Sequence, residues 1–383
     1  MGMNSKDRVL AVLHHQEPDR VPLALWGSYY TLNDQTYFNI LDYLEIGKPV
    51  KPFRKQKPRN SNYYDDRVMD ILGTDIRYIW SGFTDLGGAR MEIDGKDAWG
   101  VRWQRKGDTV VCIEAPLSGL SIEEIEDYTW PDPEKYIDFE LIKERLYFLE
   151  KTYPMHAIGA RAVNSYGPLE QAAELRGREN FYMDVITQPD LARLIIQKCT
   201  DVIVKTQEIY LELVSKKVDF FEIPGDDYGG TNDVMISPDL FNNLFKPALK
   251  SIVECVKRFE PRLPVVFHSD GAITKIIPGL IEAGVDVLNP LEPLPAVDWE
   301  NVKKAYTGRL CFMGGVDLKK ALRGSIEDVE EDVKRCIRTF GSRGEYILGP
   351  ANHIPPDVPP QNIVAMYEAG KKYGVYPLKL QPA

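Results

Sequence analysis

Histidine and carboxylate side chains occur together where predicted strands of this 383-residue chain end. His268 and Asp270 are two residues apart in the run Phe-His-Ser-Asp-Gly, and His353 follows a predicted strand near the end of the sequence. A loop that opens directly after a strand breaks the alternation of side chains, so both members of the first pair can face the same side. With His353 they supply three nitrogen and oxygen ligands and leave a fourth position open, which is what catalytic zinc requires.

We therefore predict a metal site formed by His268, Asp270 and His353. Glu222, at the end of another predicted strand, is a further candidate ligand. The alternative is a metal-free polar pocket in which His268 hydrogen-bonds to a neighbouring carboxylate.

Two adjacent aspartates, Asp226 and Asp227, follow a predicted strand in the run Gly-Asp-Asp-Tyr-Gly-Gly. Adjacent side chains rarely point the same way, so we expect at most one of the two to enter a pocket and act as a general acid or base. The other would brace the glycine-rich loop that follows. Asp75 opens a further predicted strand and is a third candidate for catalysis, although its local sequence fits a capping role equally well.

Aromatic side chains near predicted strand ends are candidates for substrate binding: Trp26, Tyr29, Tyr30 and Tyr228. Asn289 ends another predicted strand and adds a polar group to this set. Pockets for flat or apolar ligands are lined by such aromatic side chains together with a few polar groups. The alternative is that the aromatic residues only pack an inserted segment against the rest of the protein.

Short apolar runs alternate with helical stretches along most of the chain, which is typical of a parallel sheet covered by helices. The predicted strands cover residues 21–26, 75–80, 157–163, 218–223, 263–268, 285–290, 310–315 and 346–349. Eight strands in this rhythm predict a (β/α)8 TIM barrel of class α/β, whose active site lies at the carboxyl ends of the strands. A doubly wound open sheet would need a glycine-rich nucleotide loop after the first strand, and VPLALWGSYYT has none.

The barrel is predicted to be a single domain over residues 1–383, with an N-terminal extension. An aromatic and polar segment near residues 28–62 interrupts the pattern and is interpreted as an insertion over the barrel mouth. A second insertion, near residues 88–115, contains Asp-Gly and Gly-Asp pairs between alternating segments, which predicts a β-hairpin.

Charge and composition exclude several classes of function. The formal net charge is −10, which disfavours binding to nucleic acids and to anionic membrane surfaces. No apolar run approaches the roughly 20 residues of a membrane span, and the N-terminus lacks a signal-peptide pattern. The five cysteines include no Cys-x-x-Cys pair, so a disulfide framework is not expected. We expect a cytoplasmic enzyme that acts on a small molecule, with a homodimer as the common oligomeric state.

Motifs along nearly the whole chain resemble the uroporphyrinogen-decarboxylase superfamily. In order, they are DRVLAVLHHQEPDRVPL, GPLEQAAELRG, GDDYG, SPDLFNNLFKPALKSI, FHSDGAITKIIPGLIEAGVDVLNPLEP, FMGGVD and GPANHIPPDVPPQNI. The resemblance implies the barrel fold. It leaves two activities open, since the superfamily contains porphyrinogen decarboxylases and also corrinoid-dependent methyltransferases.

The sequence departs from both branches. The decarboxylases grip substrate carboxylates with an arginine pair after the first strand, where this chain has LALWGSYYT and no cation. Asp75 resembles the place of that branch's essential aspartate. The methyltransferases hold zinc with a His-x-Cys motif and a later cysteine. Here Asp270 stands in place of the first cysteine, and Asn352 and His353 stand where the second would be.

Imidazole and carboxylate ligands suit the polarisation of an ether or alcohol oxygen. We therefore expect a methyltransferase that moves a methyl group from a small methylated substrate, such as a methyl ether, to a corrinoid carried by a separate protein. Zinc, or an acid such as Asp227, would activate the substrate oxygen. The alternatives are decarboxylation of a porphyrinogen or another carboxylic acid, and a non-catalytic binding protein.

Overall fold

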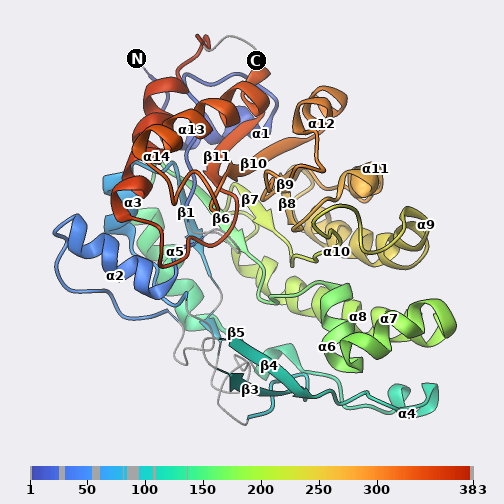
Figure 1. The fold of residues 1–383 in the computed structure, drawn as a ribbon. Coiled ribbons are helices and arrows are strands. Elements are labelled where there is room, and N and C mark those ends of the chain that lie inside the picture. Colours follow the sequence, from blue (N-terminus) through green and yellow to red (C-terminus); the bar gives the residue numbers. More distant parts are fainter. Residues whose placement is uncertain are drawn as a thin grey trace.

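Parallel strands form a curved sheet at the centre of the molecule, with helices around it, in the computed structural model shown in Figure 1. The structure describes residues 2–25, 31–53, 61–80, 82–83, 95–106, 109–135 and 137–379. Seven strands are hydrogen-bonded in the order β1-β6-β7-β8-β9-β10-β11, and every neighbouring pair is parallel. This architecture confirms the predicted (β/α)8 barrel.

The seven strands coincide with seven of the eight predicted apolar runs and differ from them by at most two residues at either end. They are β1 Ile76–Ile79, β6 Ala157–Arg161, β7 Phe220–Glu222, β8 Val265–His268, β9 Val287–Asn289, β10 Cys311–Val316 and β11 Tyr346–Pro350. Almost all of their residues are buried, as expected for strands covered on both faces.

The helices follow the strands in the expected alternation. The α-helices are α1 Ser5–Leu13, α2 Asp34–Tyr43, α3 Asp66–Leu72, α4 Ile122–Glu126, α5 Phe139–Thr152, α6 Pro168–Arg176, α7 Arg178–Thr187, α8 Pro189–Val214, α9 Pro238–Leu240, α10 Lys246–Phe259, α11 Ile277–Glu282, α12 Trp299–Tyr306, α13 Ile326–Phe340 and α14 Pro360–Tyr373. Short 3-10 segments are η1 Pro133–Lys135, η3 Thr274–Ile276 and η4 Ser342–Gly344, and η2 Phe241–Phe245 is π-helical.

Local sequence explains where the outer helices begin and which face they bury. Helix α13 starts with a capping box in which Ser325 and Asp328 satisfy each other's backbone N–H groups. Its apolar residues Val329, Val333 and Ile337 are fully buried and recur at helical spacing, and the helix packs against β10 and β11. Its charged face points outward. The same pattern lets the helices cover the sheet.

The segment 21–25 closes the barrel between β11 and β1. Leu23 forms a parallel bridge with Leu348 of β11, and the N–H of Asp75 donates to the carbonyl of Leu23 at 2.8 Å. The predicted strand at 21–26 is thus borne out only as this bridge, with backbone hydrogen bonds from Ala24 to Leu348 at 2.8 Å and from Leu348 to Pro22 at 2.9 Å. Pro22 has no N–H to donate, and the N–H of Leu23 donates to the side chain of Asp75 instead of to a backbone carbonyl. Trp26 lies outside the described residues.

Asp75 lies at the amino-terminal end of β1, fully buried. Its carboxylate accepts hydrogen bonds from Arg8 at 2.6 Å, from Arg20 at 2.8 and 3.0 Å, from the hydroxyl of Ser5 at 2.8 Å and from the backbone of Leu23 at 2.8 Å. Helix α1, which supplies two of these donors, packs against β1, β6 and β11. The N-terminal extension therefore covers this end of the barrel through Asp75.

The two predicted insertions differ in structure. Strands β3 (Arg102–Lys106) and β4 (Thr109–Glu114) form the predicted antiparallel hairpin, which lies at the bottom of Figure 1, far from the two chain ends. A second small sheet pairs β2 (Gly82–Phe83) with β5 (Ile137–Asp138). The insertion near 28–62 contains helix α2, which packs against α14.

Among the described helices, none combines the length and apolar character needed to cross a membrane.

Replacing Asp75 by Asn should destabilise the protein by about 3–5 kcal/mol, because the buried carboxylate that pairs with both Arg8 and Arg20 is lost and Arg8 keeps only its second carboxylate partner, Asp19. Denaturant-induced unfolding measures the change. The control is Asp42→Asn at an exposed position of α2, which should shift the free energy of unfolding by less than about 0.5 kcal/mol. Equal stability of wild type and Asp75→Asn would show that this carboxylate does not hold the barrel end together.

Candidate active site

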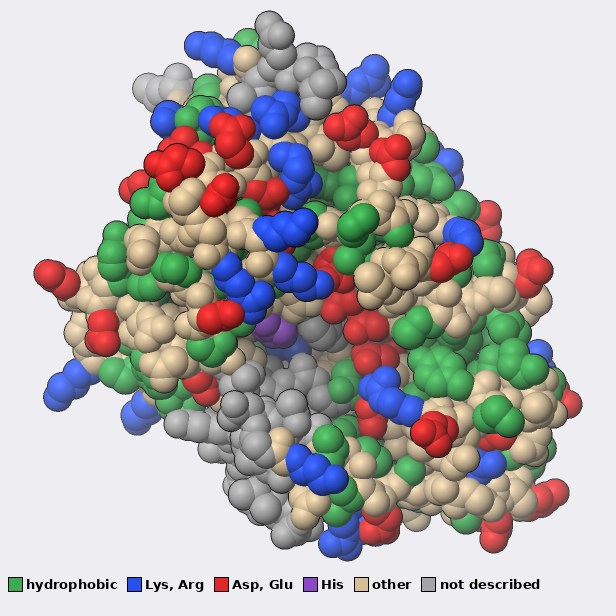
Figure 2. Space-filling view, in the orientation of Figure 1, with side chains coloured by type: hydrophobic (Ala, Val, Ile, Leu, Met, Phe, Trp, Pro, Cys, Tyr) green, Lys and Arg blue, Asp and Glu red, His purple; other side chains and the backbone are tan. Residues whose placement is uncertain are grey.

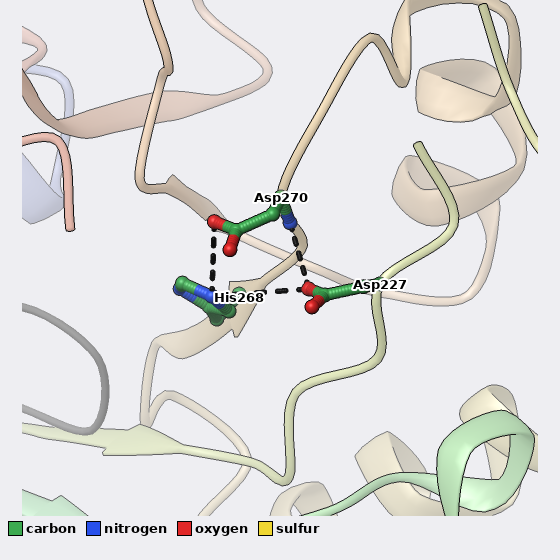
Figure 3. A group of neighbouring side chains, drawn as sticks. All are labelled: Asp227, His268 and Asp270. Carbon is green, nitrogen blue, oxygen red and sulfur yellow. Dashed lines mark hydrogen bonds and ion pairs between the residues drawn. The ribbon is translucent and has the colours of Figure 1, made fainter. Parts of the chain in front are cut away.

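A histidine and two aspartates meet at the carboxyl end of the barrel strands (Figure 3). His268 is the last residue of β8, Asp270 follows it in the loop, and Asp227 comes from the loop after the neighbouring strand β7. The Nε2 atom of His268 lies 3.3 Å from Oδ1 of Asp270 and 3.9 Å from Oδ1 of Asp227. Only 3% of the imidazole is exposed, whereas about a third of each carboxylate is, so the cluster opens to solvent on its acidic side.

The orientation of His268 is set by Asn289, the last residue of β9. The side-chain oxygen of Asn289 lies 2.7 Å from Nδ1 of the imidazole, and its amide nitrogen donates to the carbonyl of Met313 at 3.2 Å. Because the amide nitrogen is committed to a carbonyl, the oxygen must accept, and Nδ1 of His268 carries the proton. Nε2 therefore faces the two carboxylates. Asn289, predicted to bind substrate, lies 1% exposed behind the imidazole.

Two glycines allow the loops after β7 and β8 to approach closely. Gly271 has a φ of +86°, and a Cβ there would lie 2.3 Å from the carbonyl oxygen of Gly229. A Cβ on Gly229 would lie 2.6 Å from the carbonyl oxygen of Asp270. The close backbone contact lets the N–H of Asp270 donate to Oδ1 of Asp227 at 2.9 Å. Side chains at these glycines would push the two aspartates apart.

Burial and charge give the three groups different proton affinities. Burial disfavours the imidazolium of His268, but the charges of Asp270 and Asp227 and the bond to Asn289 outweigh it and raise the pKa to about 9. Burial and the charge of Asp270 raise the pKa of Asp227. Burial also acts on Asp270, but His268 and a hydrogen bond from Asn352 more than offset it and lower the pKa of that carboxyl. Asp227 is thus the better proton holder and Asp270 the better anion.

Asp226 and Asp227 point in different directions, as expected for adjacent side chains, and Asp227 is the one that joins His268 and Asp270. The carboxylate of Asp226 is 1% exposed and accepts the N–H groups of Leu169 and Glu170, at the start of helix α6, each at 2.9 Å. Burial raises the pKa of Asp226 well above its ordinary value. The hydroxyl of Tyr228 donates to the same carboxylate at 3.2 Å. Asp226 therefore braces helix α6 against the loop after β7.

Tyr228 was predicted to bind substrate, but the structure places it in the core. Only 1% of the residue is exposed, and its ring makes edge contacts with the rings of Phe241 and Phe245. The other three predicted aromatic residues, Trp26, Tyr29 and Tyr30, lie outside the described residues. Their predicted role in substrate binding stays a prediction.

The predicted ligand set meets in part. Among the described residues, the group whose ligand atoms all lie within 4.8 Å of one another consists of Asp227, His268 and Asp270. His353 and Glu222 are not members of this group. Glu222 is the fully buried last residue of β7, and His353 follows Asn352 in the loop after β11.

Sequence reasoning predicted Asp227 as an acid rather than a ligand. Since β7 and β8 are neighbours, Asp227 follows the strand adjacent to His268, and this adjacency is the signal for the grouping. Asp75, the third predicted catalytic residue, lies at the opposite end of the barrel, so the structure does not bring it to the site. Asn352, which with His353 stands in place of the later cysteine of the methyltransferases, does reach the site, where its amide donates to Asp270 at 2.8 and 3.1 Å.

The cluster fits a zinc ion. Around a tetrahedral zinc with metal–ligand distances of about 2.0–2.2 Å, ligand atoms lie about 3.3–3.5 Å apart. The separations of 3.3 and 3.9 Å from His268 to the two aspartates need only small shifts to reach this geometry. The proton on Nδ1 leaves the lone pair of Nε2 directed toward the carboxylates, so either a proton or a cation must lie between them. Acidic side chains gather around a hollow near the centre of the face shown in Figure 2.

Comparisons with known proteins agree with this fold. Residues 97–373 match the sequence model of the family described as uroporphyrinogen decarboxylase (URO-D). A uroporphyrinogen decarboxylase of Prochlorococcus marinus is 26% identical over 141 residues, which cover 36% of this chain and 38% of that protein. The chloroplastic uroporphyrinogen decarboxylase 2 of Arabidopsis thaliana is 22% identical over 274 residues, or 70% of this chain and 64% of that protein. The chain therefore spans less than two thirds of the length of these relatives.

A solved structure, a methyltransferase from Methanosarcina mazei, superimposes with a TM-score of 0.68 and covers 97% of this chain and 99% of its own. The two sequences are 17% identical, so the match shows a shared fold.

The charge on His268 should make the stability of the metal-free protein depend on pH. Its pKa rises from an ordinary value of about 6.5 to about 9 on folding, so the charged form stabilises the folded state. This contribution is fully present below about pH 6.5 and is lost as the pH rises through about 9. Relative to His268→Gln, the wild type should lose about 3 kcal/mol of unfolding free energy between pH 6 and pH 10.

Unfolding by denaturant, in the presence of a chelator, measures this difference at each pH. His14→Gln, at an exposed position after α1, is the matched control and should leave the pH profile of the wild type unchanged. If the difference in unfolding free energy between wild type and His268→Gln stays constant across this pH range, the charge pairing of His268 with the two aspartates is contradicted.

Proposed function

The chain belongs to the uroporphyrinogen decarboxylase family, and we propose that it works as a methyltransferase within that family. It moves a methyl group from a small methylated substrate to the corrinoid of a separate protein. The observation that carries the proposal is the grouping of His268, Asp227 and Asp270 at the carboxyl ends of the barrel strands. In a barrel of this kind, catalytic groups lie at that end.

His268, Asp270 and Asp227 are the residues that would hold zinc. When bound there, zinc would act as a Lewis acid on an oxygen of the substrate. Carboxylate oxygens and one imidazole form a harder ligand set than thiolates do, which favours an ether or alcohol oxygen as the fourth partner. This donor set supports a methyl ether as the substrate.

Cleaving the methyl–oxygen bond leaves its electron pair on the oxygen, and the acceptor supplies the electron pair for the new bond to carbon. The oxygen must then gain a proton to become a hydroxyl group. In the metal-free form, Asp227 is suited to give that proton, because burial and the charge of Asp270 raise its pKa. Asp270, whose pKa is lowered, stays anionic and holds the imidazolium of His268 in place.

The chain's own residues also favour access by a partner. About a third of each carboxylate is exposed, so the reacting oxygen lies near the surface rather than in a closed cavity. A corrinoid protein that docks over the carboxyl ends of the strands would meet the methyl group there. The methyltransferase from Methanosarcina mazei, which shares the fold along nearly the whole chain, adds support by analogy.

A decarboxylase of a porphyrinogen or another carboxylic acid is the second candidate, and the curated relatives favour it. Such a substrate carries several carboxylates and needs cations in the site. Asp227, Asp270 and His268 come together at the mouth, and Arg161 ends β6 at the same end of the barrel. Asp270, whose pKa is lowered, places an anion at the mouth where such a substrate would need a cation, and this favours the methyltransferase.

Purified, tag-free protein should contain about one zinc per chain, and His268→Ala should lose most of it, because the buried nitrogen ligand is removed. Elemental mass spectrometry measures the metal content. His14→Ala, an exposed histidine distant in sequence from the cluster, is the matched control and should keep the metal. If the wild type holds no metal after exposure to zinc, activation of the substrate by zinc is contradicted, and Asp227 remains as the activating acid.

Methyl transfer is tested with a panel of small aromatic methyl ethers and free cob(I)alamin as the acceptor, followed by the absorbance of the corrinoid. His268→Ala should lower the rate by at least about 100-fold, since Lewis-acid activation contributes several kcal/mol and each 1.36 kcal/mol is tenfold. Release of carbon dioxide from uroporphyrinogen, without methyl transfer from any ether, would overturn the proposal in favour of the decarboxylase.

A further inference from the structure

Asp270 receives a second fixed contact, from the loop that follows β11. The side-chain amide nitrogen of Asn352 donates to both of its carboxylate oxygens, at 2.8 and 3.1 Å. The two residues are 82 positions apart in the sequence, and strands β9 and β10 lie between β8 and β11 in the sheet. This contact therefore reaches across the mouth of the barrel.

The direction of the Asn352 amide is determined by its other hydrogen bond. Its oxygen accepts the backbone N–H of His353 at 2.7 Å, so the nitrogen must face Asp270. A reversed amide would place one oxygen against the carboxylate and an N–H against an N–H. The donor to Asp270 is thus fixed by the backbone of the same loop.

We infer that Asn352 is a positioning residue, which holds the carboxylate of Asp270 against Nε2 of His268. This inference rests on the proposed function and extends it, because Asn352 would support Asp270, one ligand of the proposed zinc site. Asn289 orients the imidazole from one side, and Asn352 orients the carboxylate from the other. A carboxylate can accept about four hydrogen bonds or metal contacts, so two donations from Asn352 leave room for zinc.

Asn352 has no direct role in the chemistry under this assignment. Groups of this kind fix the direction of a ligand, and their loss typically costs 10–100-fold in metal affinity. Without the amide, Asp270 would keep its contact to His268 but could rotate toward solvent, since about a third of its side chain is exposed. The two separations that fit zinc would then be populated less often.

The first test measures zinc affinity by competition with a chromophoric chelator. Asn352→Ala should raise the dissociation constant by about 10–100-fold, and Asn352→Gln, which keeps an N–H donor, should raise it less. The matched control is Asn362→Ala. Asn362 is an asparagine whose amide likewise donates to two acceptors, the carbonyls of Leu322 and Gly324, but it is buried on helix α14. Its loss should lower stability and leave zinc affinity unchanged.

The second test needs no metal. With all five histidines labelled with ¹⁵N, the Nε2 resonance of His268 should shift in metal-free Asn352→Ala and stay in place in Asn362→Ala. Unchanged zinc affinity together with an unchanged His268 resonance would overturn the inference. If the wild type binds no zinc while the resonance still shifts, positioning by Asn352 stands and only the metal version of the proposed function fails.

Discussion

The carboxylate of Asp75 completes the ring of strands where regular pairing fails. The segment 21–25 pairs with β11 through the backbone of Pro22 and Ala24, whereas on the side of β1 the N–H of Leu23 donates to the side chain of Asp75. The same carboxylate neutralises Arg8 and Arg20, which attach helix α1 and the following turn. Burying an anion costs several kcal/mol of stability unless the anion is paired and hydrogen-bonded. The groups that pair with Asp75 and donate hydrogen bonds to it also close the barrel.

Closure at one end fixes the spacing of the loops at the other. Because the strands are parallel and continuous from β6 to β11, the loops after β7, β8 and β11 all leave at the same end. His268 is held by a side chain of β9, and Asp270 is held by a loop three strands away. The site is thus built from single residues on separate strands, and its geometry follows from the barrel rather than from any one loop.

Sequence patterns predicted the strands well, because buried parallel strands are short apolar runs with few competing interpretations. At 21–26 the prediction holds only for a short bridge to β11, because on the other side the N–H of Leu23 donates to the side chain of Asp75. Position after a strand singled out His268, Asp270 and Asp227, which the structure brings close together. Position in the sequence could not show which way a side chain points. The directions of Asp226 and Tyr228 depend on the start of helix α6 and on the aromatic rings of the core.

The contact between Gly229 and Gly271 restricts how the loops after β7 and β8 can be exchanged in evolution or by design. In many barrels the loops at the active end vary one at a time, which allows new specificities to arise piecemeal. Here two successive loops touch through their backbones, with 2.3 Å between a notional Cβ of Gly271 and the oxygen of Gly229. Exchange of either loop alone would have to preserve this pair. The loops after β7 and β8 therefore form one unit of recombination, and a graft from another barrel would have to carry both.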